Sequence, residues 1–216
     1  MGILSHFAGV MLAGLALCFQ PTAALAHPHV WVKVRSVLIF GAGGEIVGVR
    51  HAWTFDKVYS AFATQGMGKD GVPIERALQA LAKVNVSQLA EHNYFTSLKA
   101  AGAYREFSSA KNQRLTLDAN KILTLHFDAM LTKPVAARPV AILRVYDPTY
   151  FVAFDFVPAK PVKMAGSPEG CSLSIIRPKP LTAMQQKRLD RVQGTNESPG
   201  ATFGLFLSSG AIVACP

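Results

Sequence analysis

Two alternating stretches joined by a glycine-rich turn constrain the fold of this chain more strongly than any other part of its sequence. Residues 30–40 and residues 45–55 carry apolar side chains at alternate positions, which is typical of β-strands with one buried face. The turn between them, at residues 41–44, reads Gly-Ala-Gly-Gly. Because two such strands around a short glycine turn pair with each other, we predict an antiparallel β-hairpin.

The pairing of these two strands decides which side chains share a face. If Phe40 lies opposite Glu45, then His29 lies opposite Asp56 on the polar face of the hairpin. His51 lies among the apolar side chains of the other face. A shift of the pairing by one residue would exchange the two faces.

Helical and strand patterns continue through the rest of the chain. The spacing of apolar residues predicts helices at residues 57–64, 74–83, 86–99 and 181–193. Strands are predicted at residues 113–118, 122–131, 140–146, 150–157, 172–176 and 203–213, with a hairpin turn at Asp147 and Pro148 and a loop at 158–168. The sequence therefore predicts a single α+β domain over residues 27–216, in which two or three helices pack against an antiparallel β-sheet.

The first 26 residues have the pattern of a secretory signal peptide. Residues 3–19 are almost wholly apolar, Pro21 interrupts the run, and Ala24 and Ala26 form a small-residue cleavage site. We predict cleavage after Ala26 and a periplasmic mature protein without a transmembrane span. No Lys or Arg precedes the apolar run, so an uncleaved anchor is the alternative, although the run is short for a membrane span.

Two cysteines remain after removal of the predicted signal, Cys171 and Cys215. An even pair in an exported protein favours a disulfide, which here would close the fold late in the chain. Such a bond closes a loop of about 45 residues and stabilises the fold by roughly 3–4 kcal/mol. The alternative is a pair of metal thiolates.

Cleavage after Ala26 would create a compact group of metal donors at the new terminus. His27 would then supply both its α-amine and its imidazole, and His29 would supply a second imidazole two residues later. Such a set suits copper, and imidazole also suits nickel and zinc. Pro28 has no backbone N–H, so coordination through an ionised amide at that position is excluded. The alternative is that His27 and His29 are ordinary polar residues at the end of the chain.

A second group of candidate ligands lies at the end of the predicted return strand. His51 is a candidate metal ligand or a hydrogen-bonded core residue, and Asp56 is a candidate ligand or the N-cap of the next helix. Asp56 could bind metal directly or orient an imidazole. Tyr59 lies one helical turn beyond Asp56 and could join them.

The charge of the chain is strongly basic, with 22 Lys and Arg against 13 Asp and Glu and a net charge of +9. In an exported protein this excess favours contact with anionic components of the cell envelope over nucleic acid. The sequence contains no glycine-rich phosphate loop, no Gly-x-Ser-x-Gly and no His-Glu-x-x-His. We therefore predict that the protein is not an enzyme and has no nucleic-acid partner.

Three motifs follow one another along the chain: His27-Pro28-His29-Val30-Trp31, His51-x-Trp53-Thr54-Phe55-Asp56-x-x-Tyr59-Ser60, and Tyr146-Asp147-Pro148-Thr149-Tyr150-Phe151-Val152-Ala153-Phe154. In order and spacing they resemble a bacterial domain-of-unknown-function family. Its members are commonly described as the periplasmic component of an uncharacterised ABC-type transport system. The resemblance implies an exported protein linked to nickel, cobalt or zinc transport, and it implies no catalytic residue.

These observations together predict a periplasmic accessory protein of a divalent-metal transport system. It would bind or deliver nickel, zinc, cobalt or copper through His27, His29, His51, Asp56 and Tyr59, and its partners would be membrane components of the metal transporter. The alternative is a metal-free interaction module of the envelope that uses its basic surface. A copper enzyme built on the terminal histidine is a third possibility, supported only by the terminus.

Overall fold

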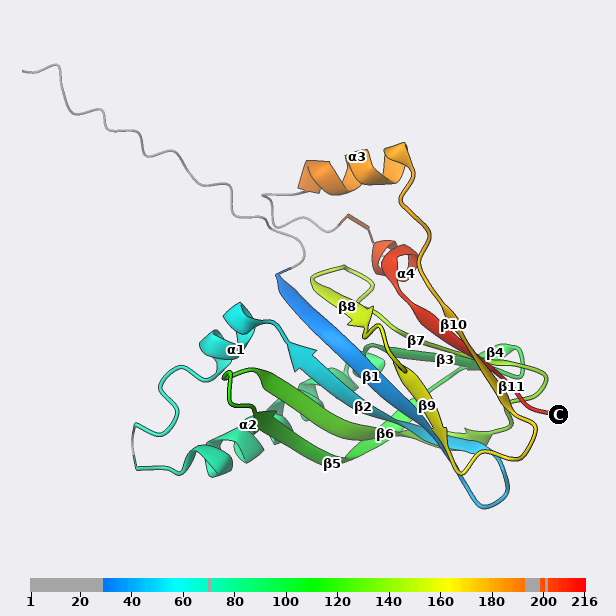
Figure 1. The fold of residues 1–216 in the computed structure, drawn as a ribbon, viewed down its shortest axis with the longest axis horizontal. Coiled ribbons are helices and arrows are strands. Elements are labelled where there is room, and N and C mark those ends of the chain that lie inside the picture. Colours follow the sequence, from blue (N-terminus) through cyan, green and yellow to red (C-terminus); the bar gives the residue numbers. More distant parts are fainter. Residues whose placement is uncertain (1–28, 70, 193–198, 201) are drawn as a thin grey trace, which may run out of the picture.

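The computed structural model describes residues 29–69, 71–192, 199–200 and 202–216 (Figure 1). The predicted signal at residues 1–26, together with His27, lies outside the described residues. In chain order the elements are β1 (Val30–Phe40), β2 (Ile46–Phe55), α1 (Lys57–Ala63), α2 (Ile74–Ala90), the 3₁₀ turn η1 (Asn93–Phe95), β3 (Thr96–Ala100), β4 (Ala103–Arg105), β5 (Phe107–Leu117), β6 (Leu123–Val135), β7 (Ala141–Val145), β8 (Val152–Phe156), β9 (Val162–Ala165), β10 (Ser172–Ile176), α3 (Ala183–Val192), α4 (Phe203–Leu207) and β11 (Gly210–Ala214).

The strands form two β-sheets, and the predicted α+β class is confirmed. Sheet A has the order β5-β6-β2-β1-β8, and β9 also pairs with β1. Sheet B has the order β10-β11-β7-β3-β4. Strands β8 and β9 run parallel to β1, whereas the other pairs are antiparallel. The predicted antiparallel β-sheet structure is thus present, and the structure divides it between two sheets (Figure 1).

The predicted β1–β2 hairpin is present, but its register differs from the prediction by two residues. Val34 lies opposite Trp53 and Ser36 lies opposite His51, with an irregularity between Ile39 and Phe40. Because side chains alternate with a period of two, a shift by two residues leaves each side chain on its predicted face. The predicted opposition of His29 and Asp56 is wrong, since the Asp56 backbone N–H donates to the Trp31 carbonyl oxygen.

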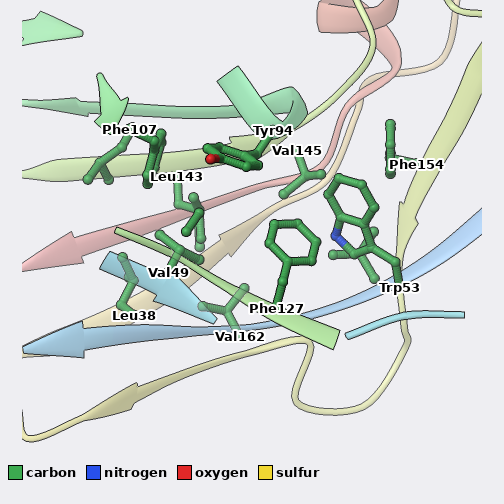
Figure 2. Packing of buried hydrophobic residues seen from close by; sticks show 14 of the residues in the cluster. Leu38, Val49, Trp53, Tyr94, Phe107, Phe127, Leu143, Val145, Phe154 and Val162 are labelled. Carbon is green, nitrogen blue, oxygen red and sulfur yellow. The ribbon is translucent and has the colours of Figure 1, made fainter. Parts of the chain in front are cut away.

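The hydrophobic core lies between the inner faces of the two sheets and one side of α2. Figure 2 shows aromatic residues at its centre, where Trp53 of β2 lies edge-on to Phe127 of β6 at 5.0 Å between ring centroids. Phe154 of β8 covers the other side of the Trp53 ring at 4.8 Å. Burial of each such side chain contributes about 1.5–3 kcal/mol, so these aromatics fix how the strands of sheet A meet.

The helix predicted at residues 86–99 is wrong, because α2 is one continuous helix that ends at Ala90. The three residues of η1 have φ values of 50°, 54° and 46°, and this left-handed turn ends the helical path. Asn93 stabilises the turn, because its side-chain amide donates to the Thr96 carbonyl and accepts from the Phe107 backbone N–H. The chain beyond it enters sheet B as β3.

The hairpin predicted across Asp147 and Pro148 is also wrong, since β7 belongs to sheet B and β8 belongs to sheet A. The turn thus carries the chain from one sheet to the other. Its buried Asp147 carboxylate accepts hydrogen bonds from the Thr149 backbone N–H and hydroxyl and from the Val152 backbone N–H. These bonds stabilise a tight turn that alone does not force the two strands to pair.

The C-terminal part differs from prediction in detail. The stretch predicted as one strand at residues 203–213 begins with α4 and continues as β11, and β9 lies within the predicted loop at 158–168. The predicted disulfide between Cys171 and Cys215 is confirmed and closes the β10–β11 pair. Within the described residues, no helix has both the length and the apolar character needed to cross a membrane.

Candidate functional site

Three segments that are distant in sequence meet at one end of sheet A. Strand β2 runs antiparallel to β1, so the end of β2 lies at the start of β1. Strand β8 runs parallel to β1, and Val30 lies opposite Val152. The His29 backbone N–H also donates to the Phe151 carbonyl at 2.9 Å. The described residues of all three sequence motifs are therefore gathered in one region of the molecule (Figure 1).

A cavity of about 510 Å³ lies beneath this region, between sheet A and the end of α2. Its size is within the range of small-molecule sites. The motifs supply most of its apolar wall, and α2 with the residues after it supplies the polar rim. The motif residues in the wall are Val30, Trp53, Phe55, Tyr59, Phe151, Val152 and Phe154, and the polar residues are Asn85, Gln88, Glu91 and His92.

His29 stands at the start of β1 beside this cavity. Its side chain is exposed, and its ring lies against the ring of Phe151 with 4.4 Å between centroids. The hydrogen bond from the His29 backbone N–H to the Phe151 carbonyl also keeps these two residues together. His29 thus contacts the cavity wall through Phe151.

Asp56 connects the start of β1 to α1. One carboxylate oxygen accepts from the Tyr59 backbone N–H at 2.8 Å, which confirms the N-cap prediction. The other oxygen accepts from the Trp31 backbone N–H at 2.9 Å. Both oxygens are therefore used to fix the backbone on either side of the site.

Tyr59 lies in the first turn of α1 and lines the cavity. Its ring stacks on Phe55 with 4.6 Å between centroids. Burial, and secondly the negative charge of Asp56, raise the pKa of the Tyr59 hydroxyl. The side chain is consequently a neutral phenol at physiological pH.

His51 is buried between the two sheets. Its Nδ1 lies 3.0 Å from the Ser36 hydroxyl of β1, and its Nε2 lies 3.1 Å from the Thr96 hydroxyl of β3. Burial lowers the pKa of this imidazole to about 3, against a small opposing effect of the Asp128 charge. A neutral ring with both nitrogens hydrogen-bonded matches the core interpretation of this residue, and it joins sheet A to sheet B.

The indole N–H of Trp53 is the one buried side-chain donor or acceptor without a hydrogen-bond partner among the described residues. The indole lies edge-on to Phe127 with an interplanar angle of 87°. Figure 2 shows its nitrogen on the side of the ring that faces Phe127. A T-shaped pair with the donor on the Phe127 side is the arrangement in which weak N–H contacts to aromatic rings occur.

The part of the chain that the structure describes contains no group of three or more His, Cys, Asp or Glu side chains arranged to hold a metal ion. Of the five predicted metal ligands, the structure brings His29, Asp56 and Tyr59 to the same end of sheet A. It places His51 in the core, and His27 lies outside the described residues.

Sequence reasoning missed the polar residues at the end of α2. Glu91 and His92 line the cavity, and the His92 ring stacks on Phe95 with 5.5 Å between centroids. The helix predicted at residues 86–99 would have continued past His92, whereas α2 ends at Ala90 and the exposed His92 lies in the turn after it. The left-handed turn that redirects the chain there has no sequence signal stronger than Asn93.

The fold and the site define a two-sheet α+β domain whose motifs surround an apolar cavity at one end of a sheet. The chain belongs to the family described as "Protein of unknown function (DUF1007)", whose profile matches residues 12–215. It is also similar to an "Uncharacterized protein" of Haemophilus influenzae, with 23% identity over 209 residues that cover 95% of this chain and 97% of the relative. Neither description names an activity or a ligand.

Proposed function

We propose that this protein is a periplasmic accessory of a divalent-metal transport system and that it binds its metal through the N-terminal histidines. The observation that carries the proposal is that residues of the three motifs line one cavity at the start of β1, with the His29 ring against Phe151 of its wall. His27 precedes His29 by two residues in the sequence.

The chemistry of the segment suits a transferable metal ion. Cleavage after Ala26 gives a terminal amine and the imidazoles of His27 and His29, which are ligands for nickel, zinc, cobalt or copper. Their affinity depends on pH, because the amine and both imidazoles must lose their protons to bind. The ion is cargo in this proposal, so the protein needs no catalytic residue. His51 is not required, since its two nitrogens already have partners.

Exposed apolar side chains near the same end of sheet A support a docking role. Trp31 and Phe151 are 50% and 46% exposed, and Val58 and Phe62 of α1 are 80% and 74% exposed. Apolar side chains gathered on a surface are typical of protein–protein contacts. A membrane component of the transporter that binds here would meet the metal-carrying terminus.

Metal titration of the purified mature protein tests the proposal, with intact mass used to establish that the chain starts at His27. We expect stoichiometric binding of at least one of the four metals, and its loss in His29→Ala. One extra residue before His27 should weaken binding, because the terminal amine is then no longer next to the imidazole. His126→Ala, which changes a histidine on the solvent face of sheet A, should bind normally. Equal binding by His29→Ala and His126→Ala would contradict the proposal.

The second candidate function is a metal-free interaction module of the envelope. The observation that favours it is the concentration of cationic side chains on the solvent face of sheet A. This function predicts association that weakens with salt and does not respond to chelators. The metal-binding function predicts the opposite response to chelators.

A further inference from the structure

We propose that a basic cleft on the solvent face of sheet A binds a phosphate-bearing ligand. The cleft has a volume of about 490 Å³ and lies on the face of the sheet that points away from the core. It is separate from the cavity at the start of β1, so it stands whether or not the terminus binds metal.

The strand register explains why a hollow forms here. Arg35 of β1 lies opposite Ala52 of β2, Ala52 lies opposite His126 of β6, and His126 lies opposite Arg114 of β5. The four residues thus make one row across the sheet. Because Ala52 is much shorter than its neighbours, the row is lowest at its middle, between two guanidinium groups.

The neighbouring row of side chains on the same face of sheet A is held in place by hydrogen bonds and forms the base of the cleft. Arg50 donates two hydrogen bonds to Asp128, at 2.7 and 2.8 Å, and the Asn112 amide donates to the same carboxylate at 2.9 Å. Asn112 reaches it from an irregularity in β5, where its φ is 56°. Burial alone would raise the pKa of Asp128, but these hydrogen bonds and the Arg50 charge outweigh it and lower that pKa. The carboxylate is therefore ionised and fully engaged.

The cleft carries a large uncompensated positive charge. Its lining includes five Lys and Arg side chains and one carboxylate, that of Asp128. Among the described residues Asp128 forms a salt bridge with Arg50 alone, which leaves four cations for a ligand: Arg35, Arg114, Lys160 and Lys163. Arg35 also donates to the Ala159 carbonyl at 3.1 Å, and this bond holds the loop with Lys160 against the sheet.

The chemistry of the lining selects a phosphate group. Guanidinium groups match the geometry of phosphate oxygens, and lysines add charge without demanding a fixed direction. Phe127 is the aromatic residue in the lining, and it is 1% exposed because its ring lies in the core. Among its described lining residues, the cleft therefore exposes no Phe, Tyr or Trp ring on which nucleic-acid bases could stack. A free phosphate compound or the phosphate of a lipid headgroup would present the same chemistry.

His126 provides a direct measure of occupancy. Its Nε2 lies 3.1 Å from the Thr116 hydroxyl. Burial, and secondly the charge of Arg114, lower the pKa of its imidazole. A dianion bound between Arg35 and Arg114 would favour the protonated ring, so we expect the His126 pKa to rise on binding.

The test uses pyrophosphate and phosphatidylglycerol vesicles as probes of the mature protein, with calorimetry or sedimentation for binding and NMR for the His126 pKa. We expect at least one probe to bind and to raise that pKa. Arg114→Gln and Arg35→Gln should each weaken binding about tenfold. Ala52→Glu, which fills the hollow with a carboxylate, should abolish it. Arg76→Gln, an equal change of charge on the exposed face of α2, should have little effect.

Each outcome decides the proposal. Binding of pyrophosphate that depends on Arg35 and Arg114 supports a site for free phosphate compounds. Binding of vesicles alone, with the same dependence, supports a headgroup site. Failure of both probes, or an equal loss in Arg76→Gln, would overturn the proposal, because the attraction would then be absent or would come from net charge. Thermal unfolding of each variant shows that a loss of binding is not a loss of fold.

Discussion

At the scale of single residues, His51 should make the stability of the protein depend on pH. Its folded pKa of about 3 lies below the ordinary value of 6.5, so the unfolded chain binds a proton that the folded chain does not. The contribution of His51 to the free energy of unfolding is therefore fully present above pH 6.5, and it is lost as the pH decreases toward 3. The expected slope is about 1.4 kcal/mol per pH unit, or about 2 kcal/mol between pH 7 and pH 5.

Urea unfolding at several pH values, in the wild type and in His51→Gln, measures this contribution. Gln cannot titrate, so the variant should be less stable at pH 7 but should lose less stability on acidification. Parallel pH profiles for the two proteins would contradict a neutral buried His51.

Asp56 is the residue on which the start of β1 and the start of α1 both depend. Asp56→Ala removes the N-cap acceptor of α1 and the acceptor of the Trp31 N–H, and we expect a loss of about 2 kcal/mol in the free energy of unfolding. Asp56→Asn keeps one acceptor oxygen and should lose about half as much. Chemical denaturation measures both. Lys57→Ala, at the exposed neighbouring position, should cost little, and an equal cost there would show that Asp56 has no special role.

At the scale of elements, Gly204 determines how closely α4 approaches the turn between the two sheets. A Cβ atom built on Gly204 would lie 1.7 Å from the Asp147 carbonyl oxygen, which no real contact allows. Gly204→Ala should therefore displace α4 or the turn and cost about 1–3 kcal/mol. Phe206→Ala, in the same helix but half exposed, should be nearly neutral in thermal unfolding. If both variants unfold at the wild-type temperature, α4 does not pack on the turn as described.

The hairpin of β1 and β2 shows what periodicity can predict. The alternation of apolar residues placed His51 on the correct, buried face, although the register differed by two residues. A register shift by two residues leaves every side chain on the same face, so the alternating pattern alone could not exclude such a shift. It nevertheless moved the supposed partner of His29, because Asp56 pairs with Trp31 instead.

The longer-range pairings could not be derived from local patterns. Strands β7 and β8 flank a turn and alternate as a hairpin would, yet the chain changes sheets between them. Strand β8 instead pairs in parallel with β1, which lies more than a hundred residues earlier. The site depends on this non-local pairing, since it brings Phe151 to His29. The motifs could be recognised in the sequence, but their convergence on a cavity could not.

At the scale of the whole molecule, the two proposed sites use different parts of sheet A. The metal-binding terminus would lie at the start of β1, whereas the basic cleft lies across the middle of β1, β2, β6 and β5 on the solvent face. The alternation of β1 separates them further, because Val30 and Val32 point toward the cavity and Arg35 points toward the cleft. A protein with both sites could hold its cargo ion while resting on an anionic surface.

The disulfide allows stability to be changed without touching either site. Cys171 and Cys215 close the outer pair of sheet B, and Figure 1 places this C-terminal end away from the start of β1. The double variant Cys171→Ser/Cys215→Ser frees a loop whose closure is worth roughly 3–4 kcal/mol, so its free energy of unfolding should fall by about that amount. Metal stoichiometry and the effect of Arg114→Gln on pyrophosphate binding should stay the same at temperatures where the variant is folded. A variant that keeps its far-ultraviolet spectrum but loses either ligand would show that sheet B positions that site, which would contradict this prediction.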